Sequence, residues 1–436
     1  MKVLGTHDNR TKEQLARCVA AEEGARGVLC ADGHVGYSMP VGGVVGYRRF
    51  ISPSGVGYDI SCGNMAVKTN VMARDVGPND LERIADEIQS RISFGVGRKN
   101  NEPIDSPVFD RIGKSPVREQ RALNAMARQQ AGTVGSGNHY VDILEDASGA
   151  LWVACHFGSR GFGHRTATGF MNIAQGRRFH DGKGEGEMDS PPLLLDVRQP
   201  SGQDYIEAMT IASEYAYAGR EAVVAKTLEI LGATAQFTVH NNHNLAWRET
   251  HDGEELWVVR KGATPAFPGQ WGFVGGSMGD ISVVLRGVES EVSRELLYST
   301  VHGAGRVMSR TQAAGKQRRL TIWACGMRDC DGALPISTPR NPDGSNPKCP
   351  NCGHRMNKRQ SMERVKSGLV AFEAEQAKLK ARGVILRGAG ADEAPPVYRA
   401  LQSVLDAHAG TIEIAFVLQP RIVVMAGSNE FDPYKD

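Results

Sequence analysis

Residues 205–231 read YIEAMTIASEYAYAGREAVVAKTLEIL, and this run decides the class of fold. Its apolar residues recur at spacings of three and four, which predicts a long amphipathic helix. Runs rich in β-branched residues lie before and after it in the chain, LWVACHFG at 151–158 and ELWVVRKG at 255–262. Such runs predict buried strands. Because strands and helices interleave in this way, we expect a mixed α/β fold.

The rest of the chain continues this alternation. Helices are predicted at 78–92 (PNDLERIADEIQSRI) and at 362–383 (MERVKSGLVAFEAEQAKLKARG), where a glycine ends the run. Strands are predicted at 281–287 (ISVVLRG) and 412–427 (IEIAFVLQPRIVVMAG), and the residues after them, 428–436, are expected to form a frayed tail. We therefore expect one large domain over residues 1–436.

The composition is that of a soluble globular protein, with 41% hydrophobic and 23% charged residues among 436. The net charge of +2 argues against a polycationic nucleic-acid binder, so any such binding needs a local basic patch. Residues 1–24 lack the apolar core of a signal peptide, and no stretch is long enough to cross a membrane. We expect a cytoplasmic protein without a membrane partner.

Glycine-rich turns hold most of the residues that could bind a metal. They are GVGYDISCGN (55–64) with Asp59 and Cys62, GTVGSGNHYVD (132–142) with Asn138, His139 and Asp142, CHFGSRGFGH (155–164) with His156, Arg160 and His164, and VHNNHNLAWRE (239–249) with His240 and His243. A lone histidine beside a strand is more often a hydrogen-bonded core residue. Together, however, these residues are more than one divalent ion needs, and they suit two neighbouring ions that share the thiolate. Two-metal sites typically serve phosphoryl chemistry.

The stretch YSTVHGAGRVMSR (298–310) surrounds a histidine with small residues and arginines. Gly303, Ala304 and Gly305 follow His302 and would let a bulky anionic group approach the backbone. Arg306 and Arg310 have the donor geometry that phosphate oxygens need. The alternatives are a buried histidine beside a glycine turn and, for Arg310 above all, a surface ion pair. Ser277, in the turn GGSMGD (275–280), offers a further cradle for a phosphate or a base.

Taken together, these strings resemble the RtcB-type 3′-phosphate RNA ligase family. The matching strings occur in the family's order and cover roughly residues 28–425: DGHVGYSMPVGGV (32–44), GVGYDISCG (55–63), GTVGSGNHYVDI (132–143), HFGSRGFGH (156–164), HNLAWRE (243–249), RKGATPAFPG (260–269), GSMG (276–279), HGAGRVMSR (302–310) and, more weakly, DEAPPVYRAL (392–401). The expected fold is thus a single RtcB-type domain whose glycine-rich turns line a deep cleft for two metal ions.

The resemblance implies a guanylyltransferase-ligase that joins RNA 3′-phosphate or 2′,3′-cyclic phosphate ends to 5′-hydroxyl ends. His302 would attack the α-phosphate of GTP and carry GMP as a phosphoramidate before GMP passes to the RNA end. By similarity, two Mn²⁺ ions would be held by Asp59, Cys62, His139, His156 and His243. The guanylate would be contacted by Asn138, Asp142, Ser277, Ala304 and Gly305, and phosphates by Arg160, Arg306 and Arg310. The sequence does not show whether an activating protein takes part.

Three features depart from the family pattern. Ala426 stands where a lysine that contacts the guanylate is usual, and Asp142 stands where a glutamate is usual. These changes keep open a paralogue that caps 3′-phosphate ends without sealing them, or one that uses another nucleotide. A non-catalytic RNA-end-binding protein and a metal-dependent phosphoesterase are further alternatives, although neither gives the HGAGR string a purpose.

The third departure is a polar insert at 324–359 that holds four cysteines. Cys325 and Cys330 lie five apart, and Cys349 and Cys352 lie three apart after eighteen intervening residues. Four thiolates in this order favour a tetrahedral Zn²⁺ in a ribbon-like insert, with His354 as a reserve ligand. The flanking strings GKQRR (315–319) and HRMNKRQ (354–360) are basic. The insert would therefore either grip an RNA backbone or be a solvated, zinc-stapled loop without a partner.

Overall fold

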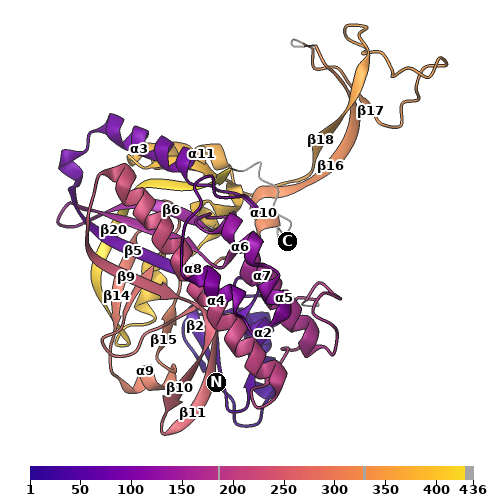
Figure 1. Ribbon diagram of the computed structural model, residues 1–436. Helices are drawn as coiled ribbons and strands as arrows, with labels where there is room; N and C mark the ends of the chain where they lie inside the picture. The colour runs from indigo at the N-terminus through magenta and orange to yellow at the C-terminus, as the bar shows by residue number, and fades with distance from the viewer. Residues whose placement is uncertain (185–186, 328–329, 428–436) are drawn as a thin grey trace.

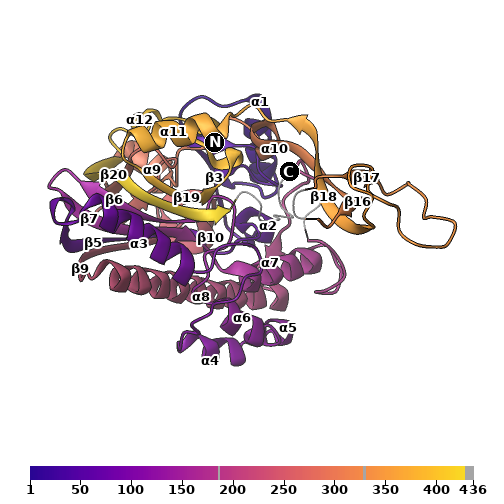
Figure 2. The same ribbon diagram turned by 90° about the horizontal axis from the view of Figure 1, so that it is seen from above.

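The computed structural model describes residues 1–184, 187–327 and 330–427. They form a mixed α/β body from which a narrow arm projects (Figures 1 and 2). The expected fold class is confirmed. The tail expected at 428–436 lies outside the described residues.

An eight-stranded sheet forms the larger half of the body. Its order is β13 (Trp271–Val274), β14 (Ser282–Gly287), β20 (Ile412–Gly427), β6 (Tyr140–Asp146), β7 (Ala150–Phe157), β5 (Gly63–Met72) and β9 (Ala235–Asn242), and β19 (Ile385–Ala389) pairs in parallel with β20. The strands predicted at 151–158, 281–287 and 412–427 are all present in it. Many of their β-branched residues, such as Val153, Val284 and Val424, are buried, whereas Ile414 and Val417 of β20 are exposed.

Two helices cover one face of this sheet. The helix α8 (Pro200–Leu231) contains the run predicted at 205–231, and α3 (Pro78–Arg91) lies beside it. Val223 and Val224 of α8 and Ile84 of α3 pack against the buried strand residues Val141 and Val153. The helix predicted at 205–231 is therefore confirmed, because its apolar residues face a sheet that needs covering.

A five-stranded sheet forms the other half of the body. Its order is β1 (Lys2–Val3), β2 (Arg26–His34), β3 (Val41–Tyr47), β11 (Glu254–Lys261) and β10 (Asn244–His251). Two short pairs flank it, β12 (Ala263–Pro265) with β15 (Ser299–Val301) and β4 (Phe50–Ile51) with β8 (Leu195–Asp196). The strand predicted at 255–262 is its β11.

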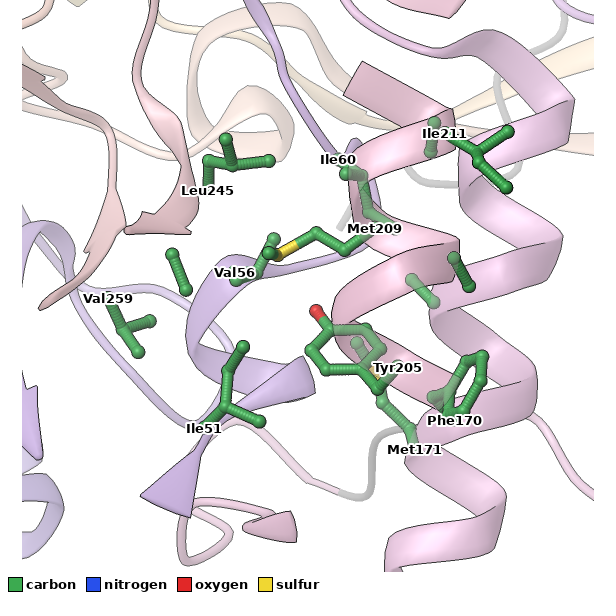
Figure 3. Close-up of a cluster of buried hydrophobic side chains, with 14 of the residues drawn as sticks. Ile51, Val56, Ile60, Phe170, Met171, Tyr205, Met209, Ile211, Leu245 and Val259 are labelled. Carbon is green, nitrogen blue, oxygen red and sulfur yellow. The ribbon is translucent and has the colours of Figure 1, made fainter. Parts of the chain in front are cut away.

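Shorter helices close the remaining faces. They are α1 (Asn9–Ala20), α2 (Pro53–Val56), α4 (Val108–Gly113), α5 (Arg118–Arg121), α6 (Asn124–Gln130), α7 (Arg160–Ala174), α9 (Glu291–Glu295), α10 (Arg310–Ala314), α11 (Phe372–Ala381) and α12 (Leu401–Asp406), with 3-10 turns η1 (Ala73–Asp75), η2 (Ala391–Glu393) and η3 (Pro395–Val397). Figure 3 shows the core that joins helices to sheet, where Tyr205 and Met209 of α8 face Val56 and Val259. In the described residues, no helix is long and apolar enough to cross a membrane.

The arm is a three-stranded antiparallel sheet of β16 (Gly315–Cys325), β17 (Ala333–Pro335) and β18 (Met356–Ser367). The helix predicted at 362–383 is thus wrong in its first part, because residues up to Ser367 pair with β16 and α11 begins only at Phe372. Between them, a Cβ added at Gly368 would lie 2.2 Å from the carbonyl oxygen of Ala313. The chain turns there against α10, so a continuous helix has no room.

Candidate metal and nucleophile site

Strand register gathers the predicted ligands at one edge of the eight-stranded sheet. Gly63 of β5 pairs with Phe157 of β7 on one side and with Asn242 of β9 on the other. Cys62, His156 and His243 each lie one residue from this row. On the next strand, β6, Tyr140 pairs with His156, so His139 reaches the same edge.

The ligand atoms form two groups that share the sulfur of Cys62. In one group, the Cys62 Sγ lies 3.3 Å from His156 Nε2, which lies 3.4 Å from His243 Nε2. In the other, His139 Nε2 lies 3.6 Å from the same sulfur and 3.2 Å from Asp59 Oδ2. Ligands at 2.0–2.3 Å from a tetrahedral ion stand about 3.3–3.8 Å apart. The two groups therefore have the spacing of two adjacent metal sites.

The protonation of these residues suits metal binding. His139 Nδ1 is 3.0 Å from the carbonyl oxygen of Val134, and His156 Nδ1 is 3.1 Å from that of Asn138. With a metal bound, each Nδ1–H would donate there and each Nε2 lone pair would be available to the ion. Burial raises the pKa of Asp59, but the hydrogen bond and charge of His139 outweigh it and lower that pKa to about 2. The buried Oδ1 of Asp59 has no hydrogen-bond partner within the part of the chain that the structure describes.

Burial also raises the pKa of the Cys62 thiol well above its ordinary value. A bound cation is what would convert this thiol to a thiolate. The donor set of carboxylate, thiolate and three imidazoles thus fits a pair of divalent transition-metal ions. His240, the other histidine of its string, does not join them, because its Nε2 accepts a hydrogen bond from Arg220 Nε at 2.9 Å.

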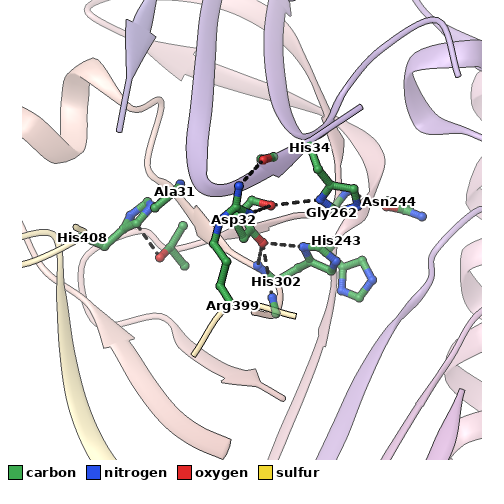
Figure 4. Close-up of polar contacts among 12 residues, drawn as sticks. Ala31, Asp32, His34, His243, Asn244, Gly262, His302, Arg399 and His408 are labelled. Atoms are coloured by element: carbon green, nitrogen blue, oxygen red, sulfur yellow. Dashed lines mark hydrogen bonds and ion pairs between the residues drawn. The ribbon is translucent and has the colours of Figure 1, made fainter. Parts of the chain in front are cut away.

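His302 lies directly beside this cluster, with its ring centroid 4.8 Å from that of His243. Its Nδ1 is 2.6 Å from Oδ2 of Asp32, a fully buried carboxylate on β2 (Figure 4). The backbone N–H groups of His302 and Gly303 donate to the same oxygen, at 3.0 and 3.4 Å. Burial raises the pKa of Asp32, but the charge and hydrogen bonds of His302 outweigh it and lower that pKa. The ionised carboxylate fixes the proton on Nδ1 and leaves Nε2 with a free lone pair.

His302 and the five candidate metal ligands line a cavity of about 1040 Å³. The residues predicted to bind metal, nucleotide or phosphate all line it: Asp59, Cys62, Asn138, His139, Asp142, His156, Arg160, His243, Ser277, His302, Ala304, Gly305, Arg306 and Arg310. Spans that are up to about two hundred and fifty residues apart in the chain thus converge on one site. Its volume is at the upper end of the range for small-molecule sites.

The turns predicted to hold a nucleotide lie against each other. Gly275 and Gly303 form a parallel bridge, which places the turn of Ser277 beside the small residues after His302. Gly305 has φ of 76°, and a Cβ there would lie 2.3 Å from the carbonyl oxygen of Asp32. Only glycine therefore lets this turn close over β2.

Asp142 stands at the inner wall of the cavity, and its Oδ1 has no hydrogen-bond partner among the described residues. Burial raises the pKa of its carboxyl well above the usual value. Burial therefore favours the protonated form of this carboxyl in the free protein, and that form could donate or accept a hydrogen bond.

The three predicted phosphate-binding arginines have different surroundings. Arg306 donates to Tyr398 Oη at 2.9 Å and to the carbonyl oxygen of Asp392 at 2.7 Å. Arg310 lies 3.2 Å from Glu393 Oε1, so it forms an ion pair, although a largely buried one at the cavity wall. Arg160 Nη1 lies 3.1 Å from Nδ1 of His139, beside the metal cluster.

Comparison with known proteins places this chain in a family. The model of the tRNA-splicing ligase RtcB family matches residues 14–117 and 110–323. The chain belongs to the RtcB family. It is 32% identical to the RNA-splicing ligase RtcB of Escherichia coli over 315 residues, which cover 65% of this chain and 74% of that protein. It is 31% identical to the tRNA-splicing ligase RtcB of Thermococcus kodakarensis over 389 residues, which cover 71% of this chain and 79% of that one.

The four arm cysteines fall outside the residues matched to the RtcB model, and the structure brings them together. Cys325 Sγ lies 3.4 Å from Cys352 Sγ, and Cys330 Sγ lies 3.5 Å from Cys349 Sγ. Zn–S bonds of 2.3 Å give sulfur–sulfur distances of about 3.8 Å, so the four sulfurs are close to a tetrahedral zinc site. His354 is exposed and is not a member of this group. The strands β16 and β18 carry the predicted insert 324–359. β16 begins before residue 324 and β18 ends after residue 359, so the arm is longer than the insert on both sides.

Several residues of this RtcB-family site were missed from the sequence. Asp32 and His34 belong to the string DGHVGY, and Asp392 and Glu393 to DEAPPVYRAL, but no role was given to any of them. His34 lines the cavity, and burial lowers its pKa to about 4, so it is neutral. The sequence feature that could have indicated Asp32 and His34 is a polar residue beside a glycine turn. No spacing in the sequence connects residue 32 with residue 302, so only the fold could pair them.

Proposed function

We propose that this chain is an RNA ligase that uses GTP and two Mn²⁺ ions to join RNA 3′-phosphate or 2′,3′-cyclic phosphate ends to 5′-hydroxyl ends. The observation that carries the proposal is the arrangement of His302. Its Nδ1 is held by Asp32, and its ring lies 4.8 Å from that of a residue in a cluster with metal-ligand spacing. A purely RNA-binding protein has no need for a histidine prepared in this way.

His302 is the nucleophile in this proposal. Its Nε2 attacks the α-phosphorus of GTP, a P–N bond forms, and the bond from that phosphorus to the pyrophosphate oxygen breaks. The ring becomes positively charged as it reacts, and the Asp32 carboxylate offsets that charge through the proton that it holds on Nδ1. Mn²⁺, when bound by Asp59, Cys62, His139, His156 and His243, would offset the negative charge of the phosphates.

The second half of the reaction uses the same cavity. GMP passes from His302 to an RNA 3′-phosphate, which is first released from its cyclic form where necessary. The 5′-hydroxyl of the other RNA end then displaces GMP and forms the phosphodiester. Arg160, Arg306 and Arg310 would position these phosphates, and the guanylate would contact Asn138, Asp142, Ser277, Ala304 and Gly305. A structural Zn²⁺ on Cys325, Cys330, Cys349 and Cys352 and a cytoplasmic location belong to the same proposal.

A second candidate is a paralogue that caps RNA 3′-phosphate ends with a nucleotide and does not seal them. The observation that favours it is the pair of differences at Asp142 and Ala426. Ala426 is buried on β20 next to Met425, which lines the cavity. An alanine has no hydrogen-bonding side chain, so it cannot make the guanylate contact that is usual in the family. The two candidates share the histidine intermediate and differ only in whether the ends are joined.

The test is to incubate the protein with α-labelled GTP and Mn²⁺, and to look for label that survives denaturing electrophoresis. His302→Ala should abolish the label, whereas His180→Ala, an exposed histidine outside the cavity, should keep it. RNA with 3′-phosphate and 5′-hydroxyl ends should then be joined by the wild type. Capped but unjoined RNA would establish the second candidate. No label with any nucleotide would contradict both.

A further inference from the structure

The charge of this protein is divided unequally between arm and body. Residues 315–367 hold eleven lysines and arginines and four aspartates and glutamates, a net charge of +7 in a chain whose net charge is +2. The rest of the chain therefore carries −5. Four thiolates around one divalent ion carry −2, which would still leave the arm at about +5. A positive element on a negative body is the electrostatic footprint of a polyanion-binding surface.

Three basic side chains of the arm are exposed to solvent. Lys316, Arg359 and Lys366 are all exposed on β16 and β18. Lys316 lies directly opposite Lys366 in the strand pairing. Like charges in this position destabilise a strand pair. A bound polyanion would remove this repulsion.

The arm is rooted at the wall of the cavity. Arg310 lines the cavity and begins α10, and β16 begins directly after that helix at Gly315. The returning chain is fixed to the same helix, since the N–H of Leu369 donates to the carbonyl oxygen of Gln312 at 2.9 Å. From this root the arm stands clear of the body in both views (Figures 1 and 2). A strand of twelve residues, such as β18, spans about 36 Å.

We propose that the arm binds the phosphate backbone of the RNA whose end lies in the cavity. The inference rests on the proposed function, because that function places an RNA end at the arm's root. The arm touches phosphates and not bases, so it adds affinity for long RNA without choosing its sequence. Because the strands lead away from the cavity, a long RNA contacts more of the arm than an RNA of a few nucleotides, which therefore gains less from it.

The test compares two RNAs that carry the same 3′-phosphate end, a six-nucleotide strand and a hairpin with a stem of about fifteen base pairs. Binding is measured by fluorescence anisotropy over a range of salt concentrations. The arm variant Lys316→Thr, Arg359→Thr and Lys366→Thr should bind the hairpin at least tenfold more weakly at low salt. Its salt slope should fall by about 0.9 for each RNA phosphate that the arm no longer neutralises. Its affinity for the short RNA should fall by a smaller factor.

Two controls isolate the arm. Lys316→Arg, Arg359→Lys and Lys366→Arg keep the charge and should restore hairpin binding. The body variant Arg74→Ala, Lys114→Ala and Arg118→Ala removes three exposed charges elsewhere and should bind both RNAs like the wild type. Circular dichroism and zinc content of the arm variant check that the arm is still folded.

Hairpin binding that is unchanged in the arm variant would overturn the proposal. A protein would then be the alternative partner of the arm. An equal loss on both RNAs would also overturn it, because the charges would then act on the cavity and not along the strands. Failure of the proposed function is seen separately. It appears as absence of the GMP label on the wild type, whereas the arm variant should keep that label.

Discussion

Asp142 presents a buried carboxyl with an unpaired oxygen to the cavity, and this makes its protonation measurable. Burial raises the pKa of Asp142, so the folded protein keeps a proton that the unfolded chain releases above pH ~4. Stability contributed by this group is therefore complete at low pH and is lost as pH rises toward the folded pKa. We expect Asp142→Asn, which removes the titration, to melt higher than the wild type, by a margin that grows between pH 5 and 8. The loss is up to about 1.4 kcal/mol for each pH unit.

The measurement is a set of melting curves without nucleotide at several pH values. Asp142→Glu keeps a carboxyl group and should follow the wild-type trend. A melting difference between the asparagine variant and the wild type that does not vary with pH would contradict the raised pKa of Asp142.

Some residues of this site could be predicted from the sequence, because the residues next to them in the chain indicate their chemical role. His302 stands among small residues and arginines, and Cys62 lies three residues after Asp59 in a glycine-rich turn. Asp32 could not be found in this way, because its function depends on β15 lying beside β2. Its partner is 270 residues away in sequence.

The arm is the element whose stability depends most on one ion. Its small core consists of Trp323, Met356 and the buried cysteines, with little else to hold it. Burial raises the pKa of Cys349, but the N–H groups of Asn351 and Cys352 outweigh it and lower that pKa to about 7. A thiol of this kind is prepared to become a metal thiolate at neutral pH.

We expect one Zn²⁺ per arm, and we expect Cys330→Ser or Cys352→Ser to lose it. Trp323 is buried, and its indole N–H donates to the carbonyl oxygen of Thr338 at 3.1 Å. Its fluorescence should therefore shift to longer wavelength in these variants, as the arm unfolds without the metal. Zinc content and emission spectra are the measurements, with Trp323→Phe to isolate the signal. Cys18→Ala, a body cysteine, should keep the zinc.

In these variants the body should still form the GMP adduct, because the arm is joined to the body through α10. Protein that contains no zinc as isolated, or an emission spectrum that does not respond to loss of the cysteines, would contradict the ribbon.

Helical periodicity in the sequence led to a wrong prediction for part of one element. The pattern over residues 362–383 is helical, and its second half is a helix. The first half pairs instead with β16, since the partner strand satisfies its backbone hydrogen bonds. Helical spacing of residues in a short polar segment does not show whether a strand about forty residues earlier in the chain will pair with that segment.

At the scale of the molecule, alternating strands and helices predicted the fold class, and the resemblance of glycine-rich strings predicted the family. The division into two sheets could not be predicted, because β10 and β11 leave the order of the chain to join β3. The cavity lies where elements of both halves meet. Its lining residues could be named from the sequence, but their distances could not.

Arg220 connects the core of the molecule to that cavity. It lies on α8, is completely buried, and donates from Nη1 to the carbonyl oxygens of Ser61 at 2.9 Å and Phe157 at 2.8 Å. These residues directly adjoin the candidate ligands Cys62 and His156. Burial lowers the pKa of Arg220, and the charges that oppose this effect include those of Cys62 and Asp59. The longest helix of the body thus helps to fix the metal ligands in place.

We expect Arg220→Met to melt lower than the wild type and to bind Mn²⁺ at least tenfold more weakly. Each buried carbonyl left without its donor costs about 1–3 kcal/mol, and the sulfur of Cys62 loses a compensating charge. Arg220→Lys keeps the charge without the forked donor geometry and should be intermediate. Lys226→Met, on the outer side of the same helix, should bind Mn²⁺ like the wild type. The measurement is a titration of free Mn²⁺ by electron paramagnetic resonance. Superimposable curves for Arg220→Met and the wild type would show that the ligands hold their positions without the helix.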